Sequence, residues 1–189
     1  VLRHRQTISN ADIIEKLGLP LFVKPSAGGS SFGITKVKEA EQLSLAIEKA
    51  FKESDEVVVE SFIAGTEVTC GMYKTRSKTV VLPVTEVVSK NEFFDYDAKY
   101  KNQSDEITPA RISDTLTRQI QATTEKIYDL VGAKGIVRVD YIIEESGRIV
   151  LLEVNTTPGM TPQSFLPQQI KAAGLSIQDV MRDIIEDAF

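Results

Sequence analysis

The sequence has few residues that could support thiol or imidazole chemistry. One cysteine, Cys70, among 189 residues excludes an internal disulfide framework, and its place in an alternating strand pattern predicts a small core side chain. The single histidine, His4, lies in a polar N-terminal stretch, so neither a histidine-based triad nor a zinc site is expected. Any chemistry must therefore depend on carboxylates, lysine, arginine, serine and backbone dipoles.

Long apolar runs and basic clusters are also missing. No apolar run approaches about 18 residues and no signal-peptide pattern is present, which favours a cytoplasmic protein without membrane contact. The net charge of −5, with no cluster of Lys or Arg, argues against nucleic-acid binding. A length of 189 residues allows one large or two small domains. Because the chain begins at Val1 in mid-pattern, we expect a fragment of a longer protein.

The most informative stretch is 136–161, in which two apolar, β-branched runs flank Ser146-Gly147. This dipeptide predicts a two-residue hairpin turn, which sets Asp140 opposite Glu153 and Arg138 opposite Asn155. Since side chains alternate between the faces of a strand, these four residues share one face at the open end of the hairpin. The other face is predicted to be apolar and to gather Val139, Tyr141, Ile143, Val150, Leu152 and Val154.

The polar face of this hairpin predicts a cation site. Two carboxylates directly opposite on a ladder repel each other, so a cation is expected between Asp140 and Glu153. Together with Asn155 they offer three oxygen ligands, which suit Mg²⁺. A solvated polar face on an edge hairpin is the alternative that the register leaves open.

A glycine-rich loop follows Lys24 and reads K-P-S-A-G-G-S-S-F-G. Its glycines let the backbone approach a ligand, and successive N–H groups can form an anion-binding nest. It is not a Walker A loop, because Ile34 stands where the lysine should be and the loop joins two strands. Lys24 could supply the charge from outside the loop. A flexible surface turn is the alternative interpretation.

The mostly apolar run Val57–Ile63, broken by Glu60, is the third chemical signal. Backbone groups of such a strand can bond an adenine edge while apolar side chains cover the ring. Glu67, just past Gly65, could accept hydrogen bonds from ribose hydroxyls. An ordinary core strand with exposed carboxylates explains the same pattern.

Strand and helix patterns are mixed along the chain without a regular βαβ alternation, which predicts the α+β class. The segment 89–105 lacks either period and is rich in aromatic and charged residues. A loop of this length is usually functional or disordered.

Taken together, these stretches resemble the D-alanine–D-alanine ligase family of the ATP-grasp superfamily. The resemblance rests on the glycine loop and on V-V-V-E-S-F-I-A-G-T-E, F-F-D-Y-D-A-K-Y, V-R-V-D-Y and L-L-E-V-N-T-T-P-G-M-T-P-Q-S-F-L-P, and it covers nearly all 189 residues in order. It implies an ATP-grasp fold whose two α+β subdomains, 1–65 and 66–189, have mainly antiparallel sheets and clasp the nucleotide.

The resemblance also implies a role for each site residue. Phosphate and flap contacts would come from Lys24, Gly29, Ser31 and Lys99, and adenine and ribose contacts from Glu60, Phe62, Ile63 and Glu67. Two Mg²⁺ ions, replaceable by Mn²⁺, would be held by Asp140, Glu153 and Asn155. Ser30 and Tyr100 would bond each other, Arg138 and the Gly159 N–H would form an oxyanion hole, and Ser164 would bind the second substrate's carboxylate.

The implied reaction is ATP-dependent joining of two D-alanines through an acyl phosphate, for peptidoglycan precursor synthesis. Family members carry an N-terminal substrate domain and an early lysine that do not occur in these residues, so the fragment by itself is expected to be inactive. The full-length enzyme is expected to be a cytoplasmic homodimer, formed through that N-terminal domain. A D-alanine–D-lactate or D-alanine–D-serine ligase, or a non-catalytic ATP-binding module, remains an alternative; Tyr100 directly after Lys99 favours the dipeptide enzyme.

Overall fold

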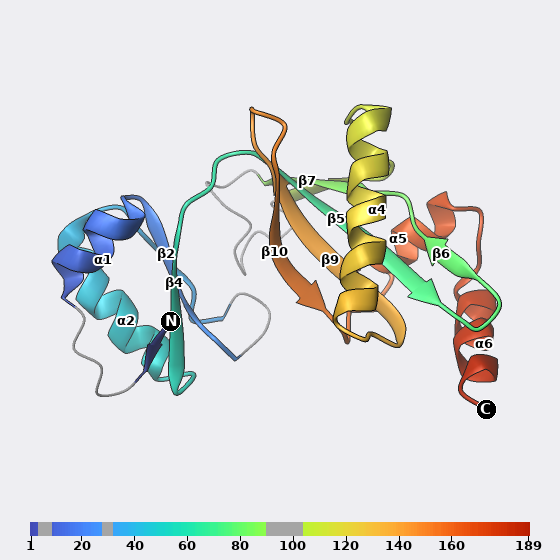
Figure 1. The fold of residues 1–189 in the computed structure, drawn as a ribbon, viewed down its shortest axis with the longest axis horizontal. Coiled ribbons are helices and arrows are strands. Elements are labelled where there is room, and N and C mark those ends of the chain that lie inside the picture. The colour runs from blue at the N-terminus through green and yellow to red at the C-terminus, as the bar shows by residue number, and fades with distance from the viewer. Residues whose placement is uncertain (4–8, 28–31, 90–103) are drawn as a thin grey trace. The chain divides into compact units, whose positions relative to one another are not determined.

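The computed structural model describes residues 1–3, 9–27, 32–89 and 104–189 (Figure 1). Val1–Ile63 forms one compact unit, and 64–89 together with Ser104–Phe189 forms another. Both units combine an antiparallel sheet with helices, which confirms the predicted α+β class. None of the helices within the described ranges is long and apolar enough to cross a membrane.

The N-terminal unit is built on a four-stranded sheet of order β1-β4-β2-β3, in which every neighbouring pair is antiparallel. Helix α1 begins where the Ser9 hydroxyl accepts from the Asp12 N–H (3.1 Å) and ends at Gly18, whose φ of 72° favours glycine. The elements are β1 (Leu2–Arg3), α1 (Asn10–Leu17), β2 (Leu21–Pro25), β3 (Thr35–Val37), the 3₁₀ helix η1 (Ala40–Gln42), α2 (Leu43–Phe51) and β4 (Glu56–Ser61).

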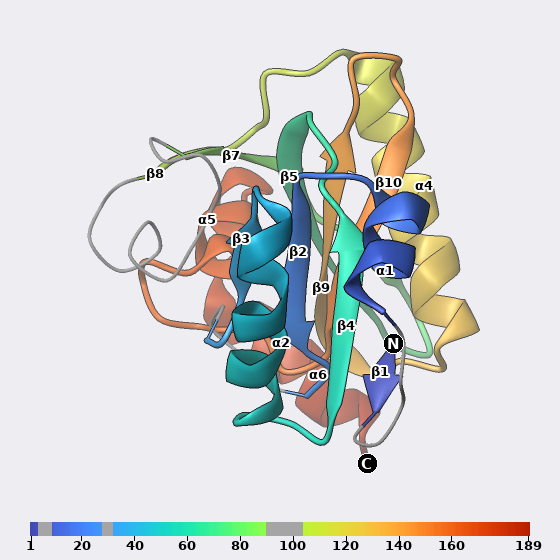
Figure 2. The same cartoon turned by 90° about the vertical axis from the view of Figure 1, so that its left-hand side faces the viewer.

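Helices cover one face of this sheet. Figure 2 shows α1 and α2 on the same side of the strands. Alternate strand residues and one stripe of each helix form the core, which contains Leu2, Ile13, Leu21, Val23, Val37, Leu43, Ala46, Ala50 and Val57. The intervening strand residues, among them Phe22, Lys24 and Glu60, lie on the opposite face because side chains alternate along a strand.

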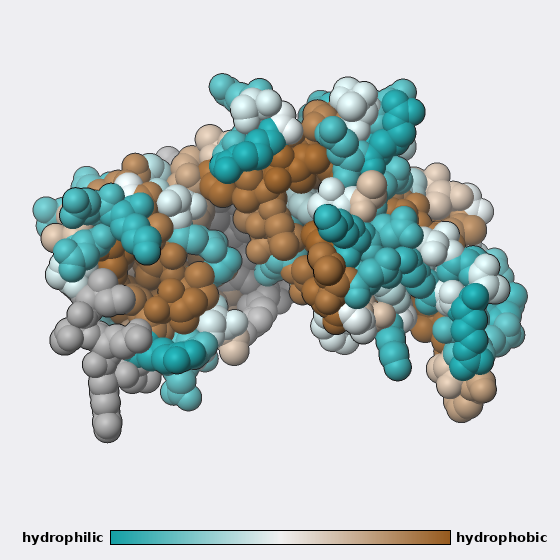
Figure 3. Space-filling view, viewed as in Figure 1, coloured by the Kyte–Doolittle hydropathy of each residue, from teal (hydrophilic) through white to brown (hydrophobic). Residues whose placement is uncertain are grey.

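The C-terminal unit is built on a six-stranded antiparallel sheet. Its order is β10-β9-β5-β7-β8, with β6 paired to β5. The strands are β5 (Thr66–Lys74), β6 (Thr79–Val81), β7 (Thr85–Ser89), β8 (Ser104–Ile107), β9 (Gly135–Ile143) and β10 (Ile149–Asn155). Figure 3 shows hydrophobic side chains gathered over β10, the strand at one end of the order, where Leu151 is 47% exposed.

Both faces of the second sheet carry helices. Helix α4 (Asp114–Leu130), which begins at the capping hydroxyl of Ser113, packs on one face through Ile120 and Tyr128 (Figure 1). Helices α5 (Phe165–Ala172) and α6 (Ile177–Asp187) pack on the other face through Leu166, Ile170 and Val180. The strand residues that meet α4 are Val68, Cys70, Met72, Val137, Val139, Tyr141 and Ile143.

The β9–β10 hairpin differs from the sequence prediction at its turn. The Gly147 N–H donates to the Glu144 carbonyl (2.8 Å), and the Glu144 N–H donates to the Arg148 carbonyl (3.0 Å). The predicted two-residue turn is therefore wrong: the loop has three residues, 145–147, and Gly147 adopts a positive φ of 81°.

A bulge between Leu151 and Glu153 compensates for this longer turn. Near the turn Ile143 pairs with Ile149, so Ile149 rather than Val150 packs against the core with Val154, and the expected places of Val150 and Leu152 on that face are wrong. Beyond the bulge the predicted register holds, because Asp140 faces Glu153 and Arg138 faces Asn155.

Helix α5 approaches β5 unusually closely. A Cβ atom at Gly71 would lie 2.2 Å from Leu166 Cδ2 and 2.7 Å from Gln169 Oε1, so a larger residue there would force these buried side chains to move. The fully buried Gln169 of α5 accepts from the Gly71 N–H (2.9 Å) and donates to the Thr69 carbonyl (2.9 Å) and to Thr85 Oγ1 (3.1 Å). These bonds fix α5, and with it the residues at its N-terminus, against the centre of the sheet.

Candidate functional site

The open face of the N-terminal sheet carries an ion pair. Lys24 Nζ lies 2.7 Å from Glu60 Oε1, and the two side chains are 25% and 39% exposed. They come from adjacent antiparallel strands, in which Phe22 pairs with Glu60 and Lys24 with Val58. Two residues that the sequence assigned to a nucleotide site are therefore neighbours on a face without helices.

Aromatic rings lie beside this ion pair. The Phe62 ring centroid is 6.1 Å from that of Phe22, and Lys36 Nζ sits 4.0 Å from the Phe62 centroid, within cation–π range. Phe22 and Lys36 were not among the predicted site residues. Phe22 could have been found from its place two residues before Lys24, whereas Lys36 required knowledge of the β2–β3 pairing. Ile63 is the last described residue of this unit.

In the C-terminal unit, Asp140 is the centre of a hydrogen-bonded cluster on the face opposite α4. Its Oδ1 accepts from Thr69 Oγ1 (2.5 Å) and Arg138 Nε (2.8 Å). Its Oδ2 accepts from Arg138 Nη2 (2.7 Å) and Asn155 Nδ2 (3.0 Å). The strand order β10-β9-β5 brings these donors together from three strands. Each carboxylate oxygen therefore has both of its lone-pair directions used.

Arg138 is buried together with Asp140, with side chains 8% and 11% exposed. Burial lowers the pKa of Arg138, but its hydrogen bonds to Asp140 and the charges of Asp140, Glu153 and Glu67 outweigh that effect and raise the pKa overall. The guanidinium carbon also lies 5.1 Å from the centroid of the Phe165 ring. Arg138 is thus a permanent, oriented cation.

Glu153 and Asn155 complete the polar face that the sequence predicted. Asn155 Nδ2 donates to Glu153 Oε1 (3.1 Å) as well as to Asp140, and the Glu153 side chain is 61% exposed. A cation between the carboxylates would repel the amide NH₂ group and attract the amide oxygen, so cation binding requires this amide to turn over. No three His, Cys, Asp or Glu side chains of the described residues are arranged as a metal site, and the predicted set has two carboxylates with an amide. These hard oxygen ligands fit Mg²⁺.

Gly159 and Ser164 lie together at the N-terminus of α5. A Cβ atom at Gly159 would lie 2.8 Å from Ser164 Oγ and 3.6 Å from Ser164 Cβ, which places the two residues in contact. Ser164 is the N-cap residue but makes no side-chain cap bond; its hydroxyl lies 2.9 Å from Thr161 Oγ1. The next residue, Phe165, contacts Arg138, which connects this helix end to the Asp140 cluster.

Of the remaining predicted site residues, the structure describes Glu67 only. Glu67 lies on β5 two residues before Thr69, and its charge contributes to the raised pKa of Arg138. The predicted residues Gly29, Ser30, Ser31, Lys99 and Tyr100 lie outside the described ranges.

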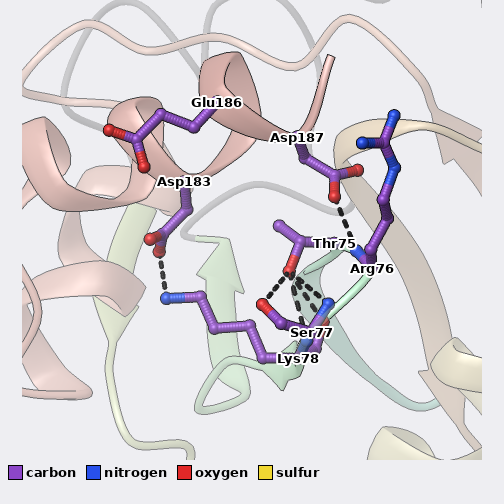
Figure 4. A pocket seen from close by; sticks show the side chains of 7 residues that line it. All are labelled: Thr75, Arg76, Ser77, Lys78, Asp183, Glu186 and Asp187. Carbon is purple, nitrogen blue, oxygen red and sulfur yellow. Dashed lines mark hydrogen bonds and ion pairs between the residues drawn. The ribbon is translucent and has the colours of Figure 1, made fainter. Parts of the chain in front are cut away.

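A polar pocket of about 180 Å³ lies at the other end of β5, between the turn 75–78 and α6 (Figure 4). Two bonds join its walls: Lys78 pairs with Asp183, and the Arg76 backbone N–H donates to Asp187 Oδ1 (2.6 Å). None of the predicted site residues that the structure describes lines this pocket. We interpret it as the packing contact between the β5–β6 turn and helix α6.

The family model described as the D-ala D-ala ligase C-terminus matches residues 2–186. The chain belongs to this family. The D-alanine–D-alanine ligase of Bacteroides fragilis is 64% identical over 189 residues, which is 100% of this chain and 58% of that protein. The corresponding ligase of Parabacteroides distasonis is 64% identical over 182 residues, or 96% of this chain and 55% of that protein.

Two solved ligase structures share the fold of this chain. The VanG D-Ala:D-Ser ligase from Enterococcus faecalis has a TM-score of 0.83 and 41% identity, covering 93% of this chain and 51% of that one. D-alanyl-alanine synthetase A from Vibrio cholerae has a TM-score of 0.84 and 27% identity, covering 98% and 58%. The family predicted from the sequence motifs is confirmed, and the chain spans little more than half the length of these relatives.

Proposed function

We propose that the full-length protein containing this chain is a cytoplasmic, ATP-dependent ligase that joins two D-alanines into D-alanyl-D-alanine for peptidoglycan precursors. The carboxylate of the first D-alanine attacks the γ-phosphorus of ATP and becomes an acyl phosphate. ADP is the leaving group. The amine of the second D-alanine then attacks this carbonyl, and phosphate leaves. The single observation that carries the proposal is the buried Arg138–Asp140 cluster beside the N-terminus of α5, in a chain 64% identical to D-alanine–D-alanine ligases.

In the N-terminal unit we assign nucleotide contacts to the open sheet face. Phe62 and Ile63 would cover the adenine, Glu60 would bond its edge, and Lys24 would bind phosphate. Because Lys24 and Glu60 are both partly exposed, phosphate can take over the lysine without leaving a buried charge unpaired. The predicted subdomain boundary between residues 65 and 66 and the predicted contacts of Gly29, Ser30, Ser31, Lys99 and Tyr100 belong to the same proposal.

In the C-terminal unit we assign Mg²⁺ to Asp140, Glu153 and Asn155, with Glu67 directed to the ribose. Bound Mg²⁺ would neutralise charge on the phosphoryl oxygens during transfer. The exposed Glu153 can turn toward a cation at little cost, whereas Asp140 is held rigidly by its neighbours. Two ions, as the resemblance implies, and replacement by Mn²⁺ are part of this proposal.

Arg138 and the N-terminus of α5 would act on the acyl group. The guanidinium is buried, always charged and oriented by Asp140, so it can stabilise an oxyanion without reorganising. The Gly159 N–H would be the second donor. Ser164, whose hydroxyl does not cap its helix, would bind the carboxylate of the acceptor D-alanine, which the helix N-terminus also favours.

D-serine is the alternative acceptor that a specific observation favours, because the similar VanG structure is described as a D-Ala:D-Ser ligase. The 64% identity to D-alanine–D-alanine ligases favours D-alanine over it. D-lactate and a non-catalytic ATP-binding role have no such support. The proposed homodimer rests on the resemblance alone.

The test uses the full-length protein with ATP, Mg²⁺ and D-alanine, following ADP release and identifying the product by mass spectrometry. D-alanyl-D-alanine as the main product, with D-serine and D-lactate used poorly, would support the proposal. Preferential use of D-serine or D-lactate would reassign the acceptor. ATP binding without D-alanine-dependent ADP release would refute ligase activity.

A further inference from the structure

We infer that Thr69 is a positioning residue for the cation site: its hydroxyl holds Asp140 Oδ1 so that Oδ2 is the oxygen presented to the cation. The inference rests on the proposed function. It concerns a residue of β5 to which no role was assigned above.

Each oxygen of Asp140 accepts one hydrogen bond from Arg138, and the second partners of the two oxygens differ. Oδ1 accepts from Thr69 Oγ1 (2.5 Å) and Arg138 Nε (2.8 Å), both groups that can only donate here. The Thr69 hydroxyl has one proton, and its other oxygen neighbour, the Val139 carbonyl, is farther away at 3.4 Å. Thr69 is 1% exposed, so water does not replace it easily. Oδ1 is therefore committed within the protein.

Oδ2 keeps its bond from Arg138 Nη2 (2.7 Å) and can be released from its second partner, Asn155 Nδ2. It shares Asn155 Nδ2 with Glu153 Oε1, and these bonds are longer, at 3.0 and 3.1 Å. When the Asn155 amide turns over, Oδ2, Glu153 and the amide oxygen all present lone pairs to the same place. Together with the two Arg138 bonds, the Thr69 bond fixes the plane of the Asp140 carboxylate, so that Oδ2 stays directed at that place.

Thr69 is itself fixed from the other side. Its carbonyl accepts from Gln169 Nε2 (2.9 Å), and Gln169 also accepts from the Gly71 N–H. The same short segment of β5 therefore holds both helix α5 and the proposed cation ligand Asp140. Residues that orient metal ligands typically change metal affinity by about 10–100-fold when they are removed.

The experiment compares Thr69→Val, which keeps the shape and removes the hydroxyl, with Thr69→Ser, which keeps the hydroxyl. Mn²⁺ alone is titrated into the full-length protein and free Mn²⁺ is followed by electron paramagnetic resonance; the Mg²⁺ dependence of ADP release is measured in parallel. We expect Thr69→Val to weaken Mn²⁺ binding about 10–100-fold and Thr69→Ser to restore most of it.

Thr124→Val is the matched control. Thr124 is equally buried and its hydroxyl lies 2.8 Å from Tyr141 Oη, on the α4 side of the same sheet. This variant should leave Mn²⁺ affinity unchanged even if it lowers stability. If Thr69→Val does not fold, Thr69→Ala against Thr69→Ser makes the same comparison.

Unchanged Mn²⁺ affinity in Thr69→Val or Thr69→Ala, in a protein whose wild type binds Mn²⁺ and releases ADP, would overturn the inference and leave the proposed function standing. Equal weakening in Thr124→Val would also overturn it, because the effect would then follow stability. A wild-type protein that neither binds Mn²⁺ through Asp140 nor releases ADP would overturn the proposed function itself.

Discussion

The two units differ in how their sheets hold charge. In the N-terminal unit helices cover one face, and the other carries the partly exposed Lys24–Glu60 pair beside Phe62. In the C-terminal unit helices pack on both faces, and Arg138 and Asp140 are buried with two hydrogen bonds between them. A charge pair on an open face can exchange partners with a ligand, whereas a buried pair cannot separate without a large cost.

The difference suggests a division of work. The open face suits a ligand that must enter and leave in every turnover, such as a nucleotide. The buried cluster suits groups whose orientation must not change, such as a cation ligand and an oxyanion donor. Substitutions in the two units should therefore have unequal effects on stability.

The largest effect is expected from Asp140→Ala. It leaves Arg138 buried without its hydrogen-bonded partner, and breaking a buried pair in this way costs about 3–5 kcal/mol. Urea denaturation followed by circular dichroism would measure the loss. A loss near zero would show that Glu153, 4.0 Å from Arg138, takes over as the counter-ion.

The rate at which Cys70 is alkylated shows whether the C-terminal unit is the part that has lost stability. Cys70 is the only cysteine in the sequence, lies in the C-terminal core, and burial raises its pKa to about 12. Because the thiolate is the reactive form, alkylation at pH 8 should be very slow until this unit opens. Asp140→Ala should speed Cys70 alkylation, and rapid alkylation of the wild type would contradict the described core.

Gln169→Leu should have the next largest effect. Leucine fills a similar volume but cannot hydrogen-bond, so the Gly71 N–H and the Thr69 carbonyl lose their buried partner. Each unsatisfied group should lower the free energy of unfolding by about 1–3 kcal/mol. The free energy of unfolding and the rate of Cys70 alkylation would both report it. Lys171→Leu, at an exposed position of the same helix, is the control and should change neither.

The smallest stability effect is expected from Glu60→Ala in the N-terminal unit. An exposed ion pair contributes about 0–1 kcal/mol, so the free energy of unfolding should change little. ATP affinity, measured by calorimetry on the full-length protein, should nevertheless fall. A stability loss as large as that of Asp140→Ala would contradict the claim that the Lys24–Glu60 pair contributes less to stability than the buried Arg138–Asp140 pair.

The sequence predicted the pairing on the polar face of the hairpin correctly, although the two-residue turn from which that pairing was counted is wrong. The alternation of Arg138, Asp140, Glu153 and Asn155 is visible in the residues, but the longer turn and the compensating bulge are not. Leu151 and Leu152 are both apolar, so no change of pattern marks where the extra residue enters the strand.

Long-range pairing set the limit of prediction. Thr69 meets Asp140 because β5 pairs with β9, a contact across 71 positions that no local pattern encodes. Lys36 reaches Phe62 in the same way, through the pairing of β2 with β3 and β4. Residues in informative local motifs, such as Gly159 and Ser164, could be recognised from the resemblance without knowledge of these pairings.

Arg138→Lys in the full-length protein tests the central claim most directly, namely that the buried cluster serves the reaction as well as the fold. A lysine keeps the charge but loses the planar fork that bonds both oxygens of Asp140. Steady-state kinetics should show kcat lowered about 10²–10³-fold, with the KM for ATP little changed. Loss confined to the KM for ATP, with kcat intact, would make Arg138 a structural counter-ion and contradict the account.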